Sequence, residues 1–345
     1  MRKFRSIYLW LGLILMVFAL AGCARNVDLR QQAKEEKTQE QKSITSMQEA
    51  ADSQDGFGHP MSSGTSDVLN SDPMKILFVG DMMFDRHIRE TVGKYGNGDC
   101  NNILEPLKEK LSEYNLVVGN LEGPITDKES VSTNTKMDES KNLIFTFDPA
   151  VAKTLFDNNI KLVNLGNNHI LNQGEKGVEQ TKKFLDEAGV EYFGYDESLA
   201  LVKEFGGVKI GFVGYNYSVS GSADVTVENI KKAKEQSDIA VVLPHWGAEY
   251  KTGEPGASVR ALAYRFIDAG ADAVIGTHPH VIQNSEEYNG QKIYYSLGNF
   301  VFDQYFQKET MEGLGVEMTI NPDRTMEFGE LKFEMTKKGQ TVLGQ

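Results

Sequence analysis

Six residues with metal-binding side chains directly follow apolar, strand-like segments of the chain. They are Asp81, Glu122, His169, His245, His278 and His280. A single histidine in such a position is more often a hydrogen-bonded structural residue, and a single aspartate is commonly a helix cap. The carboxyl ends of strands in an open α/β sheet, however, converge on one crevice. Because imidazoles and carboxylates together are the ligands that Mn²⁺, Fe and Zn²⁺ require, the recurrence of the pattern predicts a metal centre.

The segments that must position these residues alternate between short apolar runs and amphipathic stretches. Strands are predicted over 74–80, 115–119, 161–165, 208–214, 239–243 and 273–276. Helices are predicted over 103–114, 149–158, 175–188, 227–236 and 258–269. The C-terminal third is predicted to be antiparallel, because two pairs of strand-like segments each flank a turn; they are 281–283 with 292–297 and 316–320 with 327–335.

This order of elements predicts one α/β layered sandwich, α-β-β-α, with mixed sheets and an antiparallel C-terminal part. We expect the domain over residues 73–340 and a tail over 341–345. A composition of 40% hydrophobic and 25% charged residues excludes a wholly disordered, collagenous or polytopic membrane protein. The net charge of −13 and the absence of a Lys/Arg stripe in the sequence argue against a nucleic-acid partner.

The N-terminus has the features of an export signal. Residues 1–5 are basic, residues 7–19 are apolar, and a Leu-Ala-Gly-Cys box ends at Cys23. An uncleaved membrane anchor is the alternative, but the apolar run is shorter than the ~20 residues that a spanning helix needs. We therefore predict a lipoprotein signal peptide over 1–22. By resemblance to bacterial lipoproteins, Cys23 would be lipidated and would hold the protein on the outer face of the cell membrane.

The segment that follows Cys23 is polar. Residues up to 72 are rich in Gln, Glu, Lys, Ser and Asp, a composition that cannot bury enough surface to offset the entropy of ordering. We predict a disordered stalk over 23–72, with a charged helix over 31–49 as the alternative. Cys100 is then the one other cysteine of the mature chain, so a disulfide within the chain is not expected beside a lipidated Cys23.

Five ordered blocks of the sequence resemble those of the calcineurin-like metallophosphoesterases. They are Gly80-Asp81, Gly119-Asn-Leu-Glu122, Gly166-Asn-Asn-His169, Pro244-His245 and Gly276-Thr-His-Pro-His280. Between about Lys75 and Phe302 the chain more closely resembles the capsule-synthesis CapA family, also called PgsA, which is associated with poly-γ-glutamate. The blocks of that resemblance are Gly80-Asp-Met-Met-Phe-Asp-Arg86, Asn120-Leu-Glu-Gly-Pro-Ile-Thr126, Asn167-Asn-His-Ile-Leu-Asn172, His245-Trp-Gly-Ala-Glu-Tyr250, Gly276-Thr-His-Pro-His-Val281 and Ser296-Leu-Gly-Asn-Phe300.

The resemblance implies a calcineurin-like metallophosphoesterase architecture with two divalent metal ions. One ion would be held by Asn168, His245 and His278. The other would be held by Asp81 and His280, with an acidic residue as the bridge between the two ions.

The bridging residue is the point at which this chain departs from the phosphoesterase pattern. Literal register places Asn120 there, but an amide is a poor bridge between two cations. Glu122 lies two residues further along the same strand, on the same face, and carries the missing charge. We predict Glu122 as the ligand and Asn120 as a supporting or substrate-binding residue. In addition, Met83 stands where the phosphoesterases have a histidine, so one ion has fewer protein ligands; His87 is displaced by the expected turn.

Three further residues are candidates for catalysis or substrate binding. His169, adjacent to the ligand Asn168, is the predicted general acid, because the pKa of histidine lies near neutrality. Arg86 can bind a phosphate or carboxylate with its planar guanidinium, or it can be a surface arginine that pairs with Asp85 or Glu90. Asn299 either lines the pocket and contacts substrate or caps a turn.

Two functions are consistent with these features. The first is a membrane-tethered, metal-dependent hydrolase of phosphoesterase type that acts on a phosphorylated envelope substrate during capsule or poly-γ-glutamate biosynthesis. The second is a non-hydrolytic subunit of a poly-γ-glutamate synthesis complex that binds or exports the polymer. The polar segment 127–142 is interpreted either as a lid over the site or as a surface insertion.

Overall fold

The computed structural model describes residues 72–136, 138–196 and 199–345. The predicted signal peptide, the lipidated Cys23 and all but the last residue of the predicted stalk therefore lie outside the described residues.

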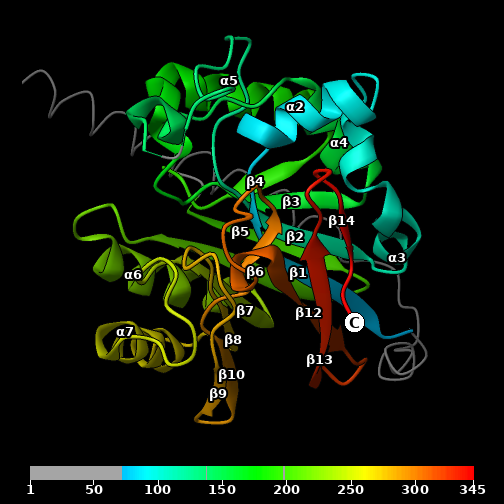
Figure 1. Cartoon of the computed structure of the whole chain (residues 1–345). Coiled ribbons are helices and arrows are strands. Elements are labelled where there is room, and N and C mark those ends of the chain that lie inside the picture. Colours follow the sequence, from blue (N-terminus) through cyan, green and yellow to red (C-terminus); the bar gives the residue numbers. More distant parts are fainter. Residues whose placement is uncertain (1–71, 137, 197–198) are drawn as a thin grey trace, which may run out of the picture. The chain divides into compact units, whose positions relative to one another are not determined.

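Two mixed β-sheets pack face to face, and helices cover the outer face of each sheet (Figure 1). The first sheet contains β1 (Met74–Met82), β2 (Leu116–Leu121), β3 (Ile160–Asn164), β4 (Glu191–Phe193), β11 (Asn299–Val301), β12 (Glu312–Ile320), β13 (Met326–Met335) and β14 (Thr341–Leu343). The second sheet contains β5 (Ala200–Phe205), β6 (Val208–Asn216), β7 (Ile239–His245), β8 (Ala273–Ile275), β9 (Ser285–Tyr288) and β10 (Gln291–Tyr294). The helices are α2 (Arg86–Tyr95), α3 (Lys108–Ser112), α4 (Ala150–Asp157), α5 (Gly174–Ala188), α6 (Ser222–Gln236) and α7 (Ala257–Asp268).

Side chains of β1 alternate between two buried faces of the sheet, which explains why its sequence is a nearly continuous apolar run. Ile76 and Phe78 pack between the two sheets, whereas Leu77 and Val79 face the helices on the other side. A strand that is buried on both faces requires apolar residues at every position. The second sheet likewise packs α6 and α7 against its outer face, through residues such as Ile230 and Phe266. The predicted α/β layered sandwich with mixed sheets is therefore confirmed.

The parallel strands determine where the site can form. β1, β2, β3 and β4 are parallel neighbours in the first sheet, and β6, β7 and β8 are parallel neighbours in the second. The carboxyl ends of parallel neighbours lie at one edge of a sheet. In the C-terminal part β9 pairs with β10 and β12 with β13 in antiparallel fashion, as predicted, but β10 also pairs in parallel with β8, and β11 with β1.

Several sequence-based expectations about the elements need correction. The predicted helix over 103–114 consists of a 3₁₀ turn at Glu105–Leu107 and the short α3, and α2 and β4 were not predicted. The predicted tail over 341–345 is folded, because β14 pairs with β13 and the buried Thr341 donates a hydrogen bond to the carbonyl oxygen of Phe300. The segment 281–283 forms isolated bridges, and the strand that pairs with β10 begins later, at Ser285. Strand β5 was missed. It joins β6 through Gly206 and Gly207, whose φ values of +55° and +84° suit a tight hairpin turn.

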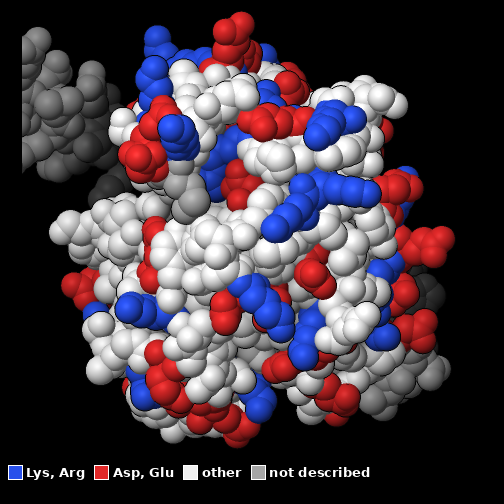
Figure 2. Space-filling view, viewed as in Figure 1, with Lys and Arg blue, Asp and Glu red and all other residues white. Residues whose placement is uncertain are grey.

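No helix among the described residues is both long and apolar enough to cross a membrane. On the face shown in Figure 2, acidic and basic side chains are interspersed over the surface.

Candidate metal centre

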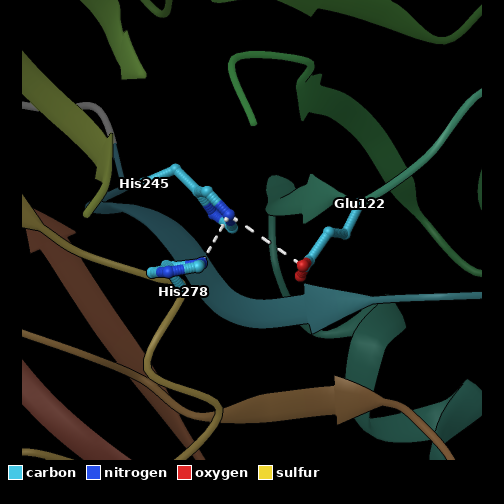
Figure 3. Close-up of side chains that lie close together, drawn as sticks. All are labelled: Glu122, His245 and His278. Carbon is cyan, nitrogen blue, oxygen red and sulfur yellow. Dashed lines mark hydrogen bonds and ion pairs between the residues drawn. The ribbon is translucent and has the colours of Figure 1, made fainter. Parts of the chain in front are cut away.

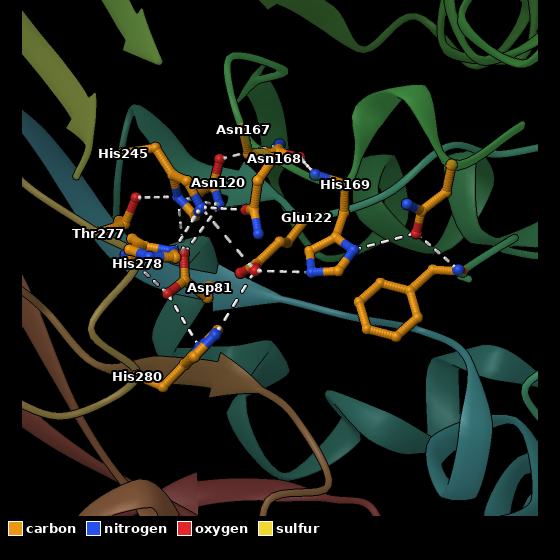
Figure 4. Close-up of polar contacts among 12 residues, drawn as sticks. Asp81, Asn120, Glu122, Asn167, Asn168, His169, His245, Thr277, His278 and His280 are labelled. Atoms are coloured by element: carbon orange, nitrogen blue, oxygen red, sulfur yellow. Dashed lines mark hydrogen bonds and ion pairs between the residues drawn. The ribbon is translucent and has the colours of Figure 1, made fainter. Parts of the chain in front are cut away.

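The candidate ligands come from the carboxyl ends of strands in both sheets (Figure 4). They are Asp81 in β1, Glu122 directly after β2, Asn168 after β3, His245 at the end of β7, and His278 and His280 after β8. Asp81, Glu122, His245, His278 and His280 are buried. The structure therefore brings together residues that are separated by up to two hundred positions in the sequence.

Glu122 is a fully buried carboxylate, and neither of its oxygens has a hydrogen-bond partner. Its Oε1 lies 3.6 Å from Nε2 of His280, 3.9 Å from Nε2 of His245 and 4.0 Å from Nε2 of His169. Burial and the neighbouring charge of Asp81 raise the pKa of Glu122 well above its ordinary value. An unpaired buried carboxylate is costly. A cation between Glu122 and the imidazoles would remove this cost, so the donor set fits a metal ion.

The side chains of the first group of candidate ligands lie around Nε2 of His245. Nδ1 of His278 is 3.1 Å from this nitrogen, and Oδ1 of Asn168 is 2.8 Å from it. Glu122, His245 and His278 form a group whose ligand atoms all lie within 4.8 Å of one another (Figure 3). Burial, followed by the nearby His278, holds the pKa of His245 well below its ordinary value, so the ring is the neutral form that binds metal.

The second group consists of Asp81, Glu122 and His280. Oδ2 of Asp81 is 3.4 Å from Nδ1 of His280, and it accepts a hydrogen bond of 3.1 Å from the backbone N–H of His278. Burial alone would raise the pKa of Asp81, but the hydrogen bond with His280 and the charges of His245 and His280 lower it to about 2. Glu122 belongs to both groups, as the predicted bridge requires.

Of the two roles predicted for Asn120, its position agrees with the supporting one, because Asn120 does not line the cleft. It is directly beside Asp81 in the register of β1 and β2, and it is 1% exposed. Its Nδ2 donates to Oδ1 of Asp81 over 2.8 Å, and its Oδ1 accepts from Nδ2 of Asn167 over 3.3 Å. Nδ2 therefore orients Asp81, while Oδ1 is held by Asn167.

Asn299 also differs from its predicted role. It is fully buried, and its Oδ1 lies 3.0 Å from Nδ1 of His280. Its Nδ2 donates to the carbonyl oxygen of Thr310 over 2.8 Å and to Oε1 of Gln304 over 3.1 Å. Because these donor bonds define the amide orientation, Oδ1 is the acceptor and Nδ1 of His280 carries the proton. Asn299 thus neither binds substrate nor caps a turn, but orients a ligand.

Arg86 lies in the wall of a cleft of about 530 Å³ beside the metal centre. Its guanidinium carbon is 5.1 Å from the ring centre of Phe145 and 5.3 Å from that of Phe302. Nη1 donates to Oδ1 of Asn142 over 3.0 Å, and Nη2 forms an ion pair with Asp303. Arg86 is therefore not a surface arginine paired with Asp85 or Glu90. Its Nε is buried without a hydrogen-bond partner, which leaves it a donor.

The described part of segment 127–142 forms another wall of this cleft. Ser132, Asn134, Thr135 and Asn142 line it, and Ser132 is buried. These residues of the segment therefore lie at the cleft, while most of its other described residues are exposed.

His169 also lines the cleft, and its ring stacks on Phe145 with 4.3 Å between the ring centres. Its Nδ1 is 3.0 Å from Oδ1 of Asn172, an oxygen that already accepts the backbone N–H of Phe145 over 2.7 Å. Nδ1 therefore carries the proton, and Nε2 faces Glu122. Burial lowers the pKa of His169 to about 4, so the ring is neutral at neutral pH.

This arrangement of ligands can be compared with known proteins. The family model described as bacterial capsule synthesis protein PGA_cap matches residues 75–304. The chain belongs to this family. It is 33% identical over 257 residues to the capsule biosynthesis protein CapA of Bacillus anthracis, which covers 68% of this chain and 61% of the relative. It is 34% identical over 258 residues to the PGA biosynthesis protein CapA of Bacillus subtilis (strain 168), which covers 69% and 65%.

This member of the PGA_cap family spans less than two thirds of the length of these two curated relatives. Its fold is similar to the crystal structure of a phosphatase from Mycoplasma pneumoniae, with 15% identity and a TM-score of 0.46. That match covers 76% of this chain and 93% of the phosphatase.

Sequence reasoning missed two residues of this PGA_cap site. The exposed Glu249 forms a third group with His278 and His280. The ring of Tyr217 lies 4.5 Å from that of His278. Glu249 stands in the His-Trp-Gly-Ala-Glu-Tyr block, only four residues after His245, so its acidic type next to a ligand was a usable signal. Tyr217 has no such signal, because it follows β6 with no other candidate ligand nearby in the sequence.

Proposed function

We propose that this member of the PGA_cap family is a metal-dependent hydrolase of phosphoesterase type that acts in capsule or poly-γ-glutamate biosynthesis. The observation that carries the proposal is Glu122, a buried carboxylate without hydrogen-bond donors among the imidazoles of His169, His245 and His280. Such a set of groups has no evident purpose in a purely structural core, because the unpaired carboxylate is destabilising.

The residues present can hold two divalent ions. Asn168, His245 and His278 would bind one ion, Asp81 and His280 the other, and Glu122 both. The mixed nitrogen and oxygen donors suit Mn²⁺, Fe or Zn²⁺. Bound ions of this kind supply Lewis acidity and a nucleophilic water at neutral pH.

The chain's own residues would bind and protonate the substrate. Arg86 has a fixed position, since Asn142 and Asp303 hold its terminal nitrogens, and its positive charge in the wall of the cleft would attract an anionic substrate. His169 presents Nε2 toward the same region. An anion bound there would raise the pKa of His169 from about 4 toward neutrality and allow it to donate a proton to a leaving group.

A non-hydrolytic role in binding or exporting the polymer is the second candidate. It is favoured by Arg86, because a guanidinium binds the carboxylate of a polyglutamate as well as it binds a phosphate. The printed names of the Bacillus relatives concern capsule and PGA biosynthesis, and neither name states a hydrolytic reaction. In either role, the proposed partners are an envelope polymer or a phosphorylated envelope substrate and the subunits of a synthesis complex. Lipidation of Cys23 would place the protein on the outer face of the cell membrane.

The test combines elemental analysis of the purified protein with hydrolysis of an aryl phosphate. We expect bound divalent metal and turnover that is lost in Glu122→Gln. A wild-type protein that binds metal, hydrolyses no phosphoester and binds polyglutamate would replace the hydrolase with the polymer-binding role. A protein that binds no divalent metal would refute the proposal.

A further inference from the structure

We infer that Glu249 is an additional metal ligand, an outer carboxylate at the mouth of the cleft that completes the ligand set of the ion at Asp81 and His280. This inference rests on the proposed metal centre. It assigns a function to a residue that the phosphoesterase-like ligand set does not include.

The position of Glu249 relative to two histidines carries the inference. A carboxylate oxygen of Glu249 and one ring nitrogen each of His278 and His280 all lie within 4.8 Å of one another. His278 belongs to the first ligand group and His280 to the second. Glu249 therefore approaches both groups, as Glu122 does, but Glu122 is fully buried whereas Glu249 is solvent-exposed and lines the cleft.

The second ligand group is the one that lacks a protein ligand. Met83 occupies the position at which the phosphoesterases have a histidine. Its side chain is fully buried, and its Sδ accepts a hydrogen bond of 3.0 Å from the backbone N–H of Asp85. The thioether is thus directed to the backbone of its own loop. Asp81, Glu122 and His280 alone make three ligands, and a carboxylate from Glu249 would supply the fourth.

The backbone keeps Glu249 next to the two histidines. The N–H of Tyr250 donates to the carbonyl oxygen of Pro279, over 2.8 Å, and Pro279 lies between His278 and His280. The hydroxyl of Tyr250 accepts from Nε2 of Gln304 over 3.0 Å, which ties the same loop to the opposite side of the cleft. Gly247, with a φ of +92°, provides the turn after β7 that brings the loop back toward these residues.

The exposure of Glu249 determines how easily this residue could release and rebind an ion. A buried ligand such as Glu122 is unpaired without the ion, whereas an exposed carboxylate is hydrated in the ion-free state. Glu249 can therefore release and recapture an ion at low cost. We assign to it the ion at Asp81 and His280, which is the more weakly bound and more easily exchanged of the two.

The test is a titration of the metal-free full-length protein with Mn²⁺ by isothermal titration calorimetry. Wild type is expected to bind two ions with different Kd values. In Glu249→Gln the weaker Kd rises about ten-fold or more while the tighter Kd stays within about two-fold. Glu90→Gln is the matched control, because Glu90 is an exposed carboxylate that lines the same cleft but belongs to none of the ligand groups. Its two Kd values should equal those of wild type.

Each alternative outcome has a distinct meaning. A Glu249→Gln isotherm that matches the isotherms of wild type and Glu90→Gln overturns the role of Glu249 and leaves the metal centre intact. A wild-type protein that binds no Mn²⁺ overturns the proposed function together with this inference. Circular dichroism of the metal-free variants checks that the fold is unchanged, which is expected because Glu249 is exposed.

Discussion

Oδ1 of Asn299 accepts a hydrogen bond of 3.0 Å from Nδ1 of His280. This contact orients the imidazole so that its Nε2 lies 3.6 Å from Oε1 of Glu122. The hydrogen bonds that Asn299 donates to Thr310 and Gln304 exclude the opposite amide orientation. The tautomer of His280, a candidate metal ligand, is thus determined by a residue that is not itself among the candidate ligands.

Loss of this contact should weaken metal binding without removing a ligand. We expect Asn299→Ala to raise the Kd for Mn²⁺ by about 10- to 100-fold. Calorimetric titration measures the effect, and Asn321→Ala, in an exposed turn between β12 and β13, is the control. An unchanged Kd would mean that Asn299 serves packing alone.

Metal removal should destabilise the protein, because the ligands come from distant segments and converge only in the native chain. At a metal concentration of 100 times Kd, binding adds about 3 kcal/mol to the free energy of unfolding. Chelation should therefore lower the Tm measured by calorimetry. In Glu122→Gln, the increase in Tm on adding metal should vanish. The metal-free Tm of this variant should be equal to or higher than that of wild type, since a neutral amide replaces the unpaired carboxylate. A lower metal-free Tm in this variant would contradict our interpretation of Glu122.

Two histidine variants should distinguish a residue that transfers a proton from a residue that binds metal. His169→Ala should reduce turnover by about 10²- to 10⁴-fold and leave the metal content near that of wild type. His245→Ala removes a ligand, so its metal content and its activity should fall together. Elemental analysis and phosphatase assays of both variants provide the comparison. If His169→Ala also loses metal, the imidazole of His169 is a ligand and not the general acid.

The metal-free protein should lose stability in mild acid. Burial lowers the pKa of His169 and of His278 from the ordinary 6.5 to about 4. Between these values the unfolded chain binds more protons than the folded one, so their contribution is present above about pH 6.5 and is lost as the pH falls. Glu122 acts in the opposite sense. Because its pKa is raised in the folded chain, its contribution to the free energy of unfolding is lost as the pH rises.

Urea unfolding in the presence of a chelator, at about pH 7 and about pH 5, measures this dependence on acid. The free energy of unfolding should be smaller at the lower pH. Equal free energies at both pH values in Glu122→Gln, which lacks the opposing carboxyl group, would contradict the lowered pKa values of the buried histidines.

The predicted membrane attachment rests on one residue outside the described part of the chain, Cys23. We expect Cys23→Ser to abolish lipidation, so that the protein shifts from the detergent phase to the aqueous phase and its mass changes. Detergent partitioning and mass spectrometry of the mature protein measure both effects. Identical partitioning and mass for variant and wild type would disprove the lipid anchor.

Much of the site was predictable from the sequence alone. Asp81, Glu122, His245, His278 and His280 each follow an apolar run, and the carboxyl ends of parallel strands meet at one edge of a sheet. The apolar runs also predicted the layered fold, because strands buried on both faces require apolar residues throughout. These conclusions depend on residue type and local pattern, which a single sequence contains.

The roles of Asn120, Asn299, Arg86 and Glu249 were decided by the tertiary structure. An amide can donate or accept in either direction, so its function depends on which groups pack around it. For Asn120 the decisive neighbours are Asp81 and Asn167, tens of residues away in the chain. The partner of Arg86 is more distant still, because Asp303 follows it by 217 positions in the sequence. Local patterns carry no information on such contacts, since only the packing of the two sheets brings these segments together.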